Sequence, residues 1–477
     1  MTQTVFLKEF AVFPVFEKFF VLRTGTLFTS ELTQDEYLWL KGLEGESRLE
    51  ADDGQVETLK RLRLISEVEL TDEVKRETDL KRIEKAQDRI FIRMIELMVA
   101  QGCNMSCTYC YGSDGEYGHK GLMSKETAFR GIDFLRDELA ARDPEGKVEP
   151  VVIFFGGEPL LAADLIRECV LYAESIWGKG KVGFGTTTNL TLLTEDLLDF
   201  LLEHGVKMVV SFDGTPELQR AHRHMKNGQD SYDIMVEKSR MLLAKAPQTP
   251  CRATRYIEED EKAIQEGMQA LGFRDFQVNA VSGNLGDSVT KSDVFIEYEQ
   301  KARSTLDFCQ AFVKAARRQD AAALEGLWND NRAAYFRIMN MLEAPAASRR
   351  VIYCGSGRTM AAVSIDGKMY PCHRFVGSEF ELGTLDGFDR RLSCQHQIVD
   401  NPKCRACAYR FGCGHPCMHV CACDAPEEPG VDPLIRAPQA YCEMFQAEIH
   451  ARAYLHATLT PDELFWLKQH VEEAISY

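Results

Sequence analysis

Between residues 90 and 283, apolar runs of strand length alternate with longer stretches that repeat an apolar residue every three or four positions. The apolar runs are FIRMIELMVA, VEPVVIFF, KVGFGTTTN, VKMVVSFDG, CRATRYI and FQVNAVSG. Helical stretches such as SKETAFRGIDFLRDELAAR and LTEDLLDFLLEHG separate them. This alternation predicts parallel βα units. Six strands fall short of a closed eight-stranded barrel. The predicted fold class is therefore α/β, with a partial, open (β/α)6 barrel over residues 89–290.

Residues 1–88 follow another pattern. Strands are expected in FAVFPVFEKFFVLRTGTLF, which is rich in Phe and Val. The segment TQDEYLWLKGLEG predicts a helix with a capping box at Thr33 and Glu36 and a stop at Gly45. A second short helix is expected in GQVETLKRLRLISE, and the charged run TDEVKRETDLKRIEKAQDR is expected to connect this unit to the barrel. Strands and small helices of this length resemble a winged-helix-like domain.

Three segments follow the barrel. Residues 291–350 are Ala-rich and predict a helical linker. Residues 351–450 contain many Cys, Gly and Pro residues with little periodicity. Residues 451–477 are expected to form a C-terminal helix that starts in TPDELFWLKQHVEEA, with Thr460 as the cap and Pro461 in the first turn.

Composition places the chain in an ordinary class. At 477 residues it needs two to four domains, and 45% apolar with 27% charged residues is typical of globular proteins. We find no apolar run near eighteen residues and no signal-peptide pattern, because Lys8, Glu9, Glu17 and Lys18 interrupt the first apolar stretch. These features predict a cytoplasmic protein without a membrane partner. The net charge of −17 disfavours nucleic acid and favours a basic partner or a peptide.

The cysteines are clustered. Of sixteen, three lie in CNMSCTYC (residues 103–110) and ten lie between Cys354 and Cys442. In a reducing compartment such clusters indicate metal sites. Three thiolates on one loop suit a [4Fe–4S] cluster with one iron free for another ligand. Zinc is the alternative, although a structural zinc site would need a fourth ligand from elsewhere.

The position of this loop is typical of an active site. It directly follows the first predicted barrel strand, at the carboxyl edge where barrels carry their active sites. The second strand ends in FFGGEP, in which Gly156 and Gly157 allow a close backbone approach and Glu158 can accept from an ammonium group. A plain turn before a helix is the alternative interpretation of this motif.

Together these motifs resemble the radical S-adenosylmethionine (radical SAM) superfamily, whose signature is C-x-x-x-C-x-aromatic-C. Here it is Cys103, Cys107, Tyr109 and Cys110. The resemblance implies that the methionyl amine and carboxylate of SAM chelate the free iron. It further implies cofactor contacts from residues in four motifs: Tyr109, Gly156, Gly157, Glu158, Pro159, Asn189, Ser211 and Arg223. Leu190 stands where the family usually has Gly.

The C-terminal cysteines resemble the SPASM domain of peptide-modifying radical SAM enzymes, which holds two auxiliary Fe–S clusters. By this resemblance an inner cluster takes Cys354, Cys372 and Cys417. An outer cluster takes Cys404, Cys407, Cys413 and Cys442. The implied cofactors are SAM and three [4Fe–4S] clusters. A zinc ribbon would explain Cys404 and Cys407 alone.

The fourth ligand of the inner cluster is open at this point. Some relatives have a cysteine where this chain has Met360. Either one iron stays free, where a substrate thiolate could bind, or Cys394, Cys421 or Cys423 closes the site. Cys169, Cys251 and Cys309 lie in apolar patterns and are expected in the core.

The resemblance implies a maturase for a ribosomally made peptide or small protein, whose N-terminal domain binds the leader as an added strand. The arrangement is most similar to thioether-forming maturases, a group that includes the enzymes crosslinking the small subunit of quinohemoprotein amine dehydrogenases. A reducing partner such as a flavodoxin or ferredoxin is implied. His373, directly after Cys372, is a candidate general base or an ordinary loop histidine. The alternatives are formylglycine formation, as in anaerobic sulfatase maturases, and a non-catalytic Fe–S electron carrier.

Overall fold

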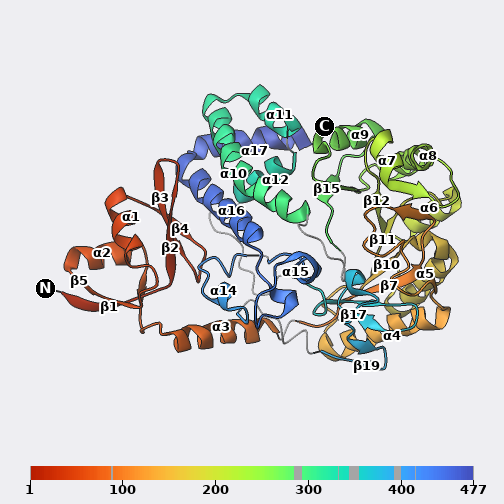
Figure 1. The fold of residues 1–477 in the computed structure, drawn as a ribbon, viewed down its shortest axis with the longest axis horizontal. Coiled ribbons are helices and arrows are strands. Elements are labelled where there is room, and N and C mark those ends of the chain that lie inside the picture. Colours follow the sequence, from red (N-terminus) through yellow and green to blue (C-terminus); the bar gives the residue numbers. More distant parts are fainter. Residues whose placement is uncertain are drawn as a thin grey trace.

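The computed structural model describes residues 2–87, 90–283, 293–330, 332–342, 354–390, 399–413 and 415–475. Figure 1 shows the N-terminal unit and the barrel at opposite ends of the molecule, with the cysteine-rich region and a group of helices between them. In this part of the chain no helix is long and apolar enough to span a bilayer.

The N-terminal unit contains two small antiparallel sheets. Strands β1 (Gln3–Leu7), β5 (Arg48–Ala51) and β6 (Ile65–Ser66) form one sheet, in the order β5-β1-β6. Strands β2 (Phe10–Val15), β3 (Lys18–Arg23) and β4 (Thr29–Leu32) form the other. Helices α1 (Gln34–Lys41) and α2 (Asp53–Arg61) pack on this core. The winged-helix-like assignment stays a prediction.

Two local predictions in this unit were only partly right. The capping box of α1 is present, since Thr33 and Glu36 each bind the other's backbone N–H, but the helix ends at Gly42 rather than Gly45. The second helix is shorter than expected, because Ile65 and Ser66 pair with β1 instead of continuing it. The long-range sheet contact outweighs the local helical pattern there.

The sheet of β2, β3 and β4 has two buried faces. Phe10 and Val12 point into the N-terminal core, whereas Phe13 and Val15 belong to a second core shared with C-terminal helices. The period of two along the strand produces this division. The charged connector forms helix α3 (Asp72–Gln87), and its Ile83 packs beside Cys404.

The six barrel strands appear where the pattern predicts them: β7 (Met94–Gln101), β10 (Val151–Gly156), β11 (Gly183–Thr188), β12 (Val206–Ser211), β14 (Cys251–Arg255) and β15 (Phe276–Ala280). They pair in parallel in the order β15-β14-β12-β11-β10-β7. The sheet stays open, so the predicted partial α/β barrel is confirmed.

Helices cover the outside of this sheet (Figure 1): α4 (Lys125–Arg142), α5 (Ala163–Trp177), α6 (Glu195–Glu203), α7 (Pro216–His222), α8 (Ser231–Lys245) and α9 (Glu261–Leu271). Most begin at a side chain that accepts from a first-turn N–H, as Ser124 does for α4 and Thr194 for α6. Cys169 and Cys251 are fully buried in the barrel core, as expected.

The hairpin of β16 (Met360–Val363) and β17 (Met369–Tyr370) was not predicted. Strand β16 pairs in parallel with β7 and extends the barrel sheet, with Val363 opposite Leu97. Shorter strands are β8 (Met105–Cys107), β9 (Gly121–Leu122), β13 (Arg223–Met225), β18 (Gly383–Thr384) and β19 (Gly387–Phe388). The cysteine-rich region therefore shares a sheet with the barrel.

The remaining helices are α10 (Asp293–Arg318), α11 (Ala321–Asp330), α12 (Arg332–Leu342), α14 (Pro402–Arg405), α15 (Met418–Asp424), α16 (Gln439–Thr458) and α17 (Pro461–Ile475). The 3-10 turns are η1 (Pro159–Ala162), η2 (His373–Phe375) and η3 (Pro433–Ile435). Helices α10, α12 and α16 form the second core, which includes the fully buried Cys309. Helix α16 crosses the expected boundary at residue 450, while α17 begins at Thr460 as predicted.

Candidate functional site

A cavity of about 560 Å³ opens at the carboxyl ends of the barrel strands. The loop after β7 contributes Cys103, Cys107 and Cys110 to its wall. The same loop also contributes Tyr109, and other segments contribute further predicted residues: Gly156, Gly157, Asn189, Ser211, Arg223 and His373. Residues from six separate segments of the sequence thus meet around one space.

The three thiols lie in a mostly buried environment. Burial raises the pKa of the Cys103 thiol to about 12 and that of Cys107 to about 11. The Cys103 sulfur accepts from the backbone N–H of Met105 at 3.3 Å and lies 3.8 Å from Asn189 Nδ2. Metal binding would have to remove the thiol protons, and these donors would stabilise the resulting charge.

The double glycine fits closely against the cysteine loop. A Cβ on Gly156, whose φ is +142°, would lie 2.1 Å from the carbonyl oxygen of Ala100. A Cβ on Gly157 would lie 2.3 Å from that of Gly102. The N–H of Gly157 donates to Ala100 and that of Glu158 donates to Gly102, at 2.8 and 3.0 Å. These positions require Gly for space, which a plain turn would not.

Glu158 lies behind this wall and is not part of the cavity lining. Its side chain accepts from the Leu160 N–H at 3.0 Å, the Thr188 hydroxyl at 2.7 Å and the Asn189 N–H at 2.8 Å. Burial raises its pKa to about 7, against these three hydrogen bonds, which lower it. In this structure Glu158 therefore connects the ends of β10 and β11, and its contact with the ammonium group of SAM stays a prediction. Pro159 is also buried, at the start of η1.

The turn after β11 keeps its special geometry without glycine. Leu190 has a φ of 59°, in the left-handed region where the family's usual Gly is favoured, and its side chain is fully buried. Packing in the barrel core offsets this backbone cost. Asn189 donates to Asn104 Oδ1 at 2.9 Å and so links this turn to the cysteine loop.

Arg223 pairs with an acidic residue that received no role from the sequence. Its Nη2 and Nε lie 3.0 Å from the two oxygens of Asp213, which is fully buried, and its guanidinium stands over the Tyr109 ring. The Tyr109 hydroxyl donates to the same carboxylate. Strand β13 also places Arg223 opposite Cys107. The SFDG motif contained this aspartate, but its partners lie 10 and 104 positions away.

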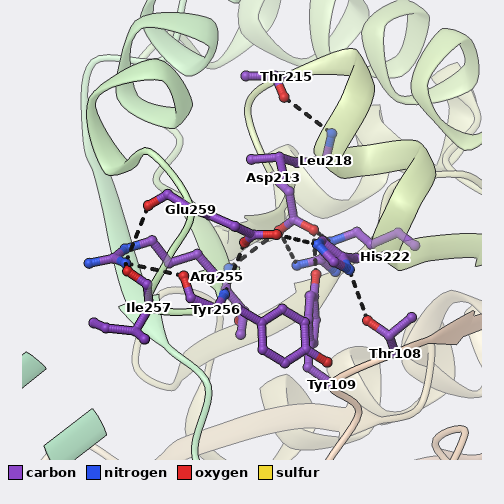
Figure 2. A network of polar contacts seen from close by, with 12 residues as sticks. Thr108, Tyr109, Asp213, Thr215, Leu218, His222, Arg255, Tyr256, Ile257 and Glu259 are labelled. Carbon is purple, nitrogen blue, oxygen red and sulfur yellow. Dashed lines mark hydrogen bonds and ion pairs between the residues drawn. The ribbon is translucent and has the colours of Figure 1, made fainter. Parts of the chain in front are cut away.

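A second network connects the cysteine loop to the end of β14 (Figure 2). His222 Nδ1 lies 3.0 Å from the Thr108 hydroxyl, and its Nε2 lies 2.5 Å from Glu259 Oε1. The other Glu259 oxygen accepts from the Tyr256 N–H at 2.9 Å. The loop after β14 is thereby held against the segment that carries Tyr109.

His373 reaches the cavity from the cysteine-rich region and is held by Glu96 of β7. Its Nδ1 lies 2.8 Å from Glu96 Oε1, and its backbone N–H donates to Oε2 at 2.7 Å. Its ring also stacks on Phe155 at 4.1 Å. A charged residue inside the apolar run FIRMIELMVA was a signal that sequence reasoning left unused.

Two arginines in the cavity lining add positive charge. Arg374 donates to the Ser282 hydroxyl at 2.9 Å and stands over the Tyr111 ring. Arg252 donates to Gln277 and lies opposite Ser211 in the sheet. The Arg374 side chain also contacts Cys417, and the Asp114 carboxylate lines the same cavity. The two arginines therefore add positive charge to a wall that also contains an acidic group.

Several C-terminal thiols lie near one another, and their division into two sets of cluster ligands stays a prediction. The other three members of the outer set, Cys413, Cys442 and Cys407, all act electrostatically on Cys404. In the inner set, Cys417 acts on both Cys354 and Cys372, and Cys372 is buried. Cys394 lies outside the described residues. Among those that are described, no three His, Cys, Asp or Glu side chains are close enough to bind one metal ion.

Comparisons with known proteins agree with this geometry. Residues 97–247 match the sequence profile of the Radical SAM superfamily. The serine-type anaerobic sulfatase-maturating enzyme of Klebsiella aerogenes is 24% identical over 60% of this chain and 68% of its own length. The radical SAM cyclopropyl synthase TigE of Paramaledivibacter caminithermalis is 26% identical over 35% of this chain and 36% of TigE.

The solved structure of native anSMEcpe with bound AdoMet superposes with a TM-score of 0.55 at 16% identity, covering 80% of this chain and 99% of that one. This likeness concerns the fold. Residues 97–247 therefore form a radical SAM domain, and the chain is similar in sequence to anaerobic sulfatase-maturating enzymes and to TigE. Its cysteine-rich C-terminal region has the cysteine pattern of a SPASM domain.

The residues present fit the cofactors that this class binds. Three thiols of one loop face the cavity, and the Gly156–Gly157 backbone lies directly behind that loop. Asn189, Ser211 and Arg223 supply the polar wall. Three thiolates suit a four-iron cluster that leaves one iron for the amine and carboxylate of SAM.

Proposed function

We propose that this protein is a radical SAM maturase that oxidatively crosslinks a ribosomally made peptide or small protein, forming a thioether between a Cys sulfur and a carbon. One observation carries the proposal. A single cavity brings the Cys103–Cys110 loop together with His373 and Arg374, the residues that directly follow the inner-set Cys372. A substrate in this cavity would contact both the Cys103–Cys110 loop, which we call the SAM side, and the residues after Cys372, which we call the auxiliary side.

The cofactors supply the difficult chemistry. When bound and reduced by a flavodoxin-like or ferredoxin-like partner, SAM and its cluster provide a 5′-deoxyadenosyl radical, and the auxiliary clusters provide an oxidant for the substrate radical. The net reaction removes two hydrogens from the peptide, one from carbon and one from the thiol. The chain must therefore position the C–H group, accept the thiol proton and exclude water.

The proton has a candidate acceptor in His373. Glu96 holds its Nδ1, so Nε2 is the ring nitrogen left to accept a proton. Stacking on Phe155 restricts the ring further. We assign Glu96 the task of positioning this imidazole.

Arg252 and Arg374 favour an anionic group in the cavity. The methionyl carboxylate of SAM is one such group, and Arg223 is already bound to Asp213. An acidic side chain of the peptide beside the reacting carbon would be another. This charge supports a peptide whose modified segment contains Asp or Glu.

The N-terminal unit is the candidate peptide-binding domain. Strand β5 is an edge strand of the β5-β1-β6 sheet, so a peptide could add to it through backbone hydrogen bonds. Peptide binding should then slow amide exchange over Arg48–Ala51. The related fold of anSMEcpe has been solved with AdoMet and the Cp18Cys peptide, which supports a peptide substrate in general.

Formylglycine formation is the second candidate, because sulfatase-maturating enzymes are among the relatives and neighbours of this chain. By the family resemblance those enzymes have an acidic residue after the cysteine that matches Cys372, and His373 in this place weighs against formylglycine formation. The sequence relatives by themselves favour neither reaction. A non-catalytic electron carrier would not need the Gly156–Gly157 cradle.

The deciding experiment is mass spectrometry of a Cys-containing peptide encoded next to this protein's gene and co-expressed with it. A thioether removes two hydrogens, keeps the sulfur and makes it resistant to alkylation. Formylglycine loses the sulfur and yields an aldehyde that reacts with hydrazides. An unmodified peptide, with SAM cleaved only unproductively, would count against both candidates.

A further inference from the structure

Helix α15 carries a buried thiol one turn after an inner-set cysteine. Cys417 stands at the N-cap of α15, and the N–H of Cys421 donates to its carbonyl oxygen at 2.9 Å. Residues four positions apart lie on the same helix face. Cys421 therefore shares the face of Cys417, and its exposed fraction is 0%.

The surroundings of Cys421 are rich in sulfur. Burial raises its pKa well above the ordinary value, and the thiols that add to this effect are, in decreasing order, Cys417, Cys404, Cys354 and Cys413. Two of these belong to the inner set and two to the outer set. Cys421 Sγ also lies 3.7 Å from Nδ1 of the buried His415. Cys421 thus stands between the two sets of cluster ligands.

The other candidates are placed less well. Cys423 lies on another face of α15, where its sulfur is 3.5 Å from both ring nitrogens of His419. Cys423 is six positions after Cys417 and so does not share the helix face of that ligand, and His419 packs against Phe375 and Tyr111. Met360 is part of β16 and offers only a thioether. Cys394 lies outside the described residues.

The number of thiols decides which set needs Cys421. The outer set has four, one for each iron of a cluster, whereas the inner set has three. We propose that Cys421 is the fourth thiolate of the inner cluster, together with Cys354, Cys372 and Cys417. This inference rests on the proposed function, since it assumes the auxiliary clusters. It leaves a substrate thiol no open iron there, so the peptide sulfur must be positioned by protein side chains.

The test isolates the auxiliary clusters from the SAM cluster. In a parent variant with Cys103, Cys107 and Cys110 all changed to Ala, anaerobic reconstitution should give about eight irons per chain. Mild ferricyanide oxidation removes the iron that lacks a thiolate and leaves a three-iron cluster with its own electron paramagnetic resonance signal. The parent and a Cys423→Ala variant should resist this conversion. A Cys421→Ala variant should lose one iron per chain.

A parent that converts as readily as the Cys421→Ala variant would overturn the proposal, as would a Cys421→Ala variant that resists like the parent. If Cys421→Ala fails to hold the inner cluster at all, a Cys394→Ala variant of the parent decides, because it should keep about eight irons and resist oxidation if Cys421 is the ligand, whereas its conversion would overturn the proposal. A parent with no auxiliary iron would overturn both proposals. The parent variant could instead keep about eight irons that resist oxidation while the wild-type protein fails to modify the peptide. That result would overturn the proposed function but not the role of Cys421.

Discussion

Arg410 and Asp79 form a buried ion pair that joins helix α3 to the cysteine-rich region, with Nε donating to Oδ2 at 3.0 Å. Their side chains are 1% and 5% exposed, and Glu9 of the N-terminal unit binds the same guanidinium. Burial raises the pKa of Asp79 even with Arg410 beside it. At this carboxyl the cost of removing water is therefore larger than the attraction to Arg410. Each of the two buried charges needs the other to remain stable in the folded protein.

We expect Arg410→Met to lower the free energy of unfolding by about 3–5 kcal/mol, because Asp79 would lose its buried counter-charge and keep only the partly exposed Arg82 at 3.6 Å. Urea unfolding of the apo-protein measures this loss. Arg405→Met, at the residue that directly follows Cys404 on α14, is the matched control and should change little. Adding Asp79→Asn to Arg410→Met should restore part of the stability. Equal losses in both arginine variants would contradict the role of the pair.

Glu158 should make stability depend on pH. Its pKa of about 7 in the folded chain lies above the ordinary value of 4.5, so the folded state holds its proton more tightly. The contribution is complete below pH 4.5 and is lost as the pH rises to about 7, a change of about 3 kcal/mol. Glu158→Gln should flatten this part of the urea-unfolding profile, although its amide would face the Asn189 N–H.

The exposed Glu126→Gln on α4 is the control for that profile and should leave its slope intact. The contrary result would be a free energy of unfolding that rises between about pH 5 and 7 by the same amount in the wild type and in the Glu158 variant. That result would show that folding does not raise the pKa of Glu158. The apo-protein is the proper sample, because bound clusters add their own pH dependence.

The reconstituted wild-type chain should contain about twelve irons and matching sulfide, for three four-iron clusters. Changing Cys103, Cys107 and Cys110 to Ala should leave about eight and abolish formation of 5′-deoxyadenosine. Iron and sulfide assays with electron paramagnetic resonance measure both. Zinc in place of iron, or the loss of all iron in the triple variant, would contradict the assignment.

His373→Gln should lower the rate of peptide crosslinking by about 100- to 10,000-fold, the usual worth of a general base. SAM cleavage should continue, because His373 belongs to the auxiliary side of the cavity. Glu96→Gln keeps a hydrogen-bonding partner and should lose less. The two products are counted in one assay by liquid chromatography and mass spectrometry. A parallel loss of SAM cleavage would assign His373 to cavity structure instead.

The barrel could be predicted because its signals are local. Strand runs, helical spacing and the Cys103–Cys110 signature each lie within a few residues, and most of their side chains meet at one cavity. The pairing of Glu96 with His373 spans 277 positions, and that of Asp213 with Tyr109 spans 104. No local pattern encodes such partners. Glu158 shows the same limit, since its contacts with Thr188 and Asn189 span 30 and 31 positions and were not predicted.

The parallel pairing of β16 with β7 has a mechanical consequence. The strand that leads into Cys103 and the strand that separates Cys354 from Cys372 run side by side in one sheet, with Met94 opposite Met360. Sliding or hinging between them would break backbone hydrogen bonds on both. This pairing would hold the proposed SAM cluster and the proposed inner cluster at one distance, so substrate entry is expected to depend on the motion of other segments.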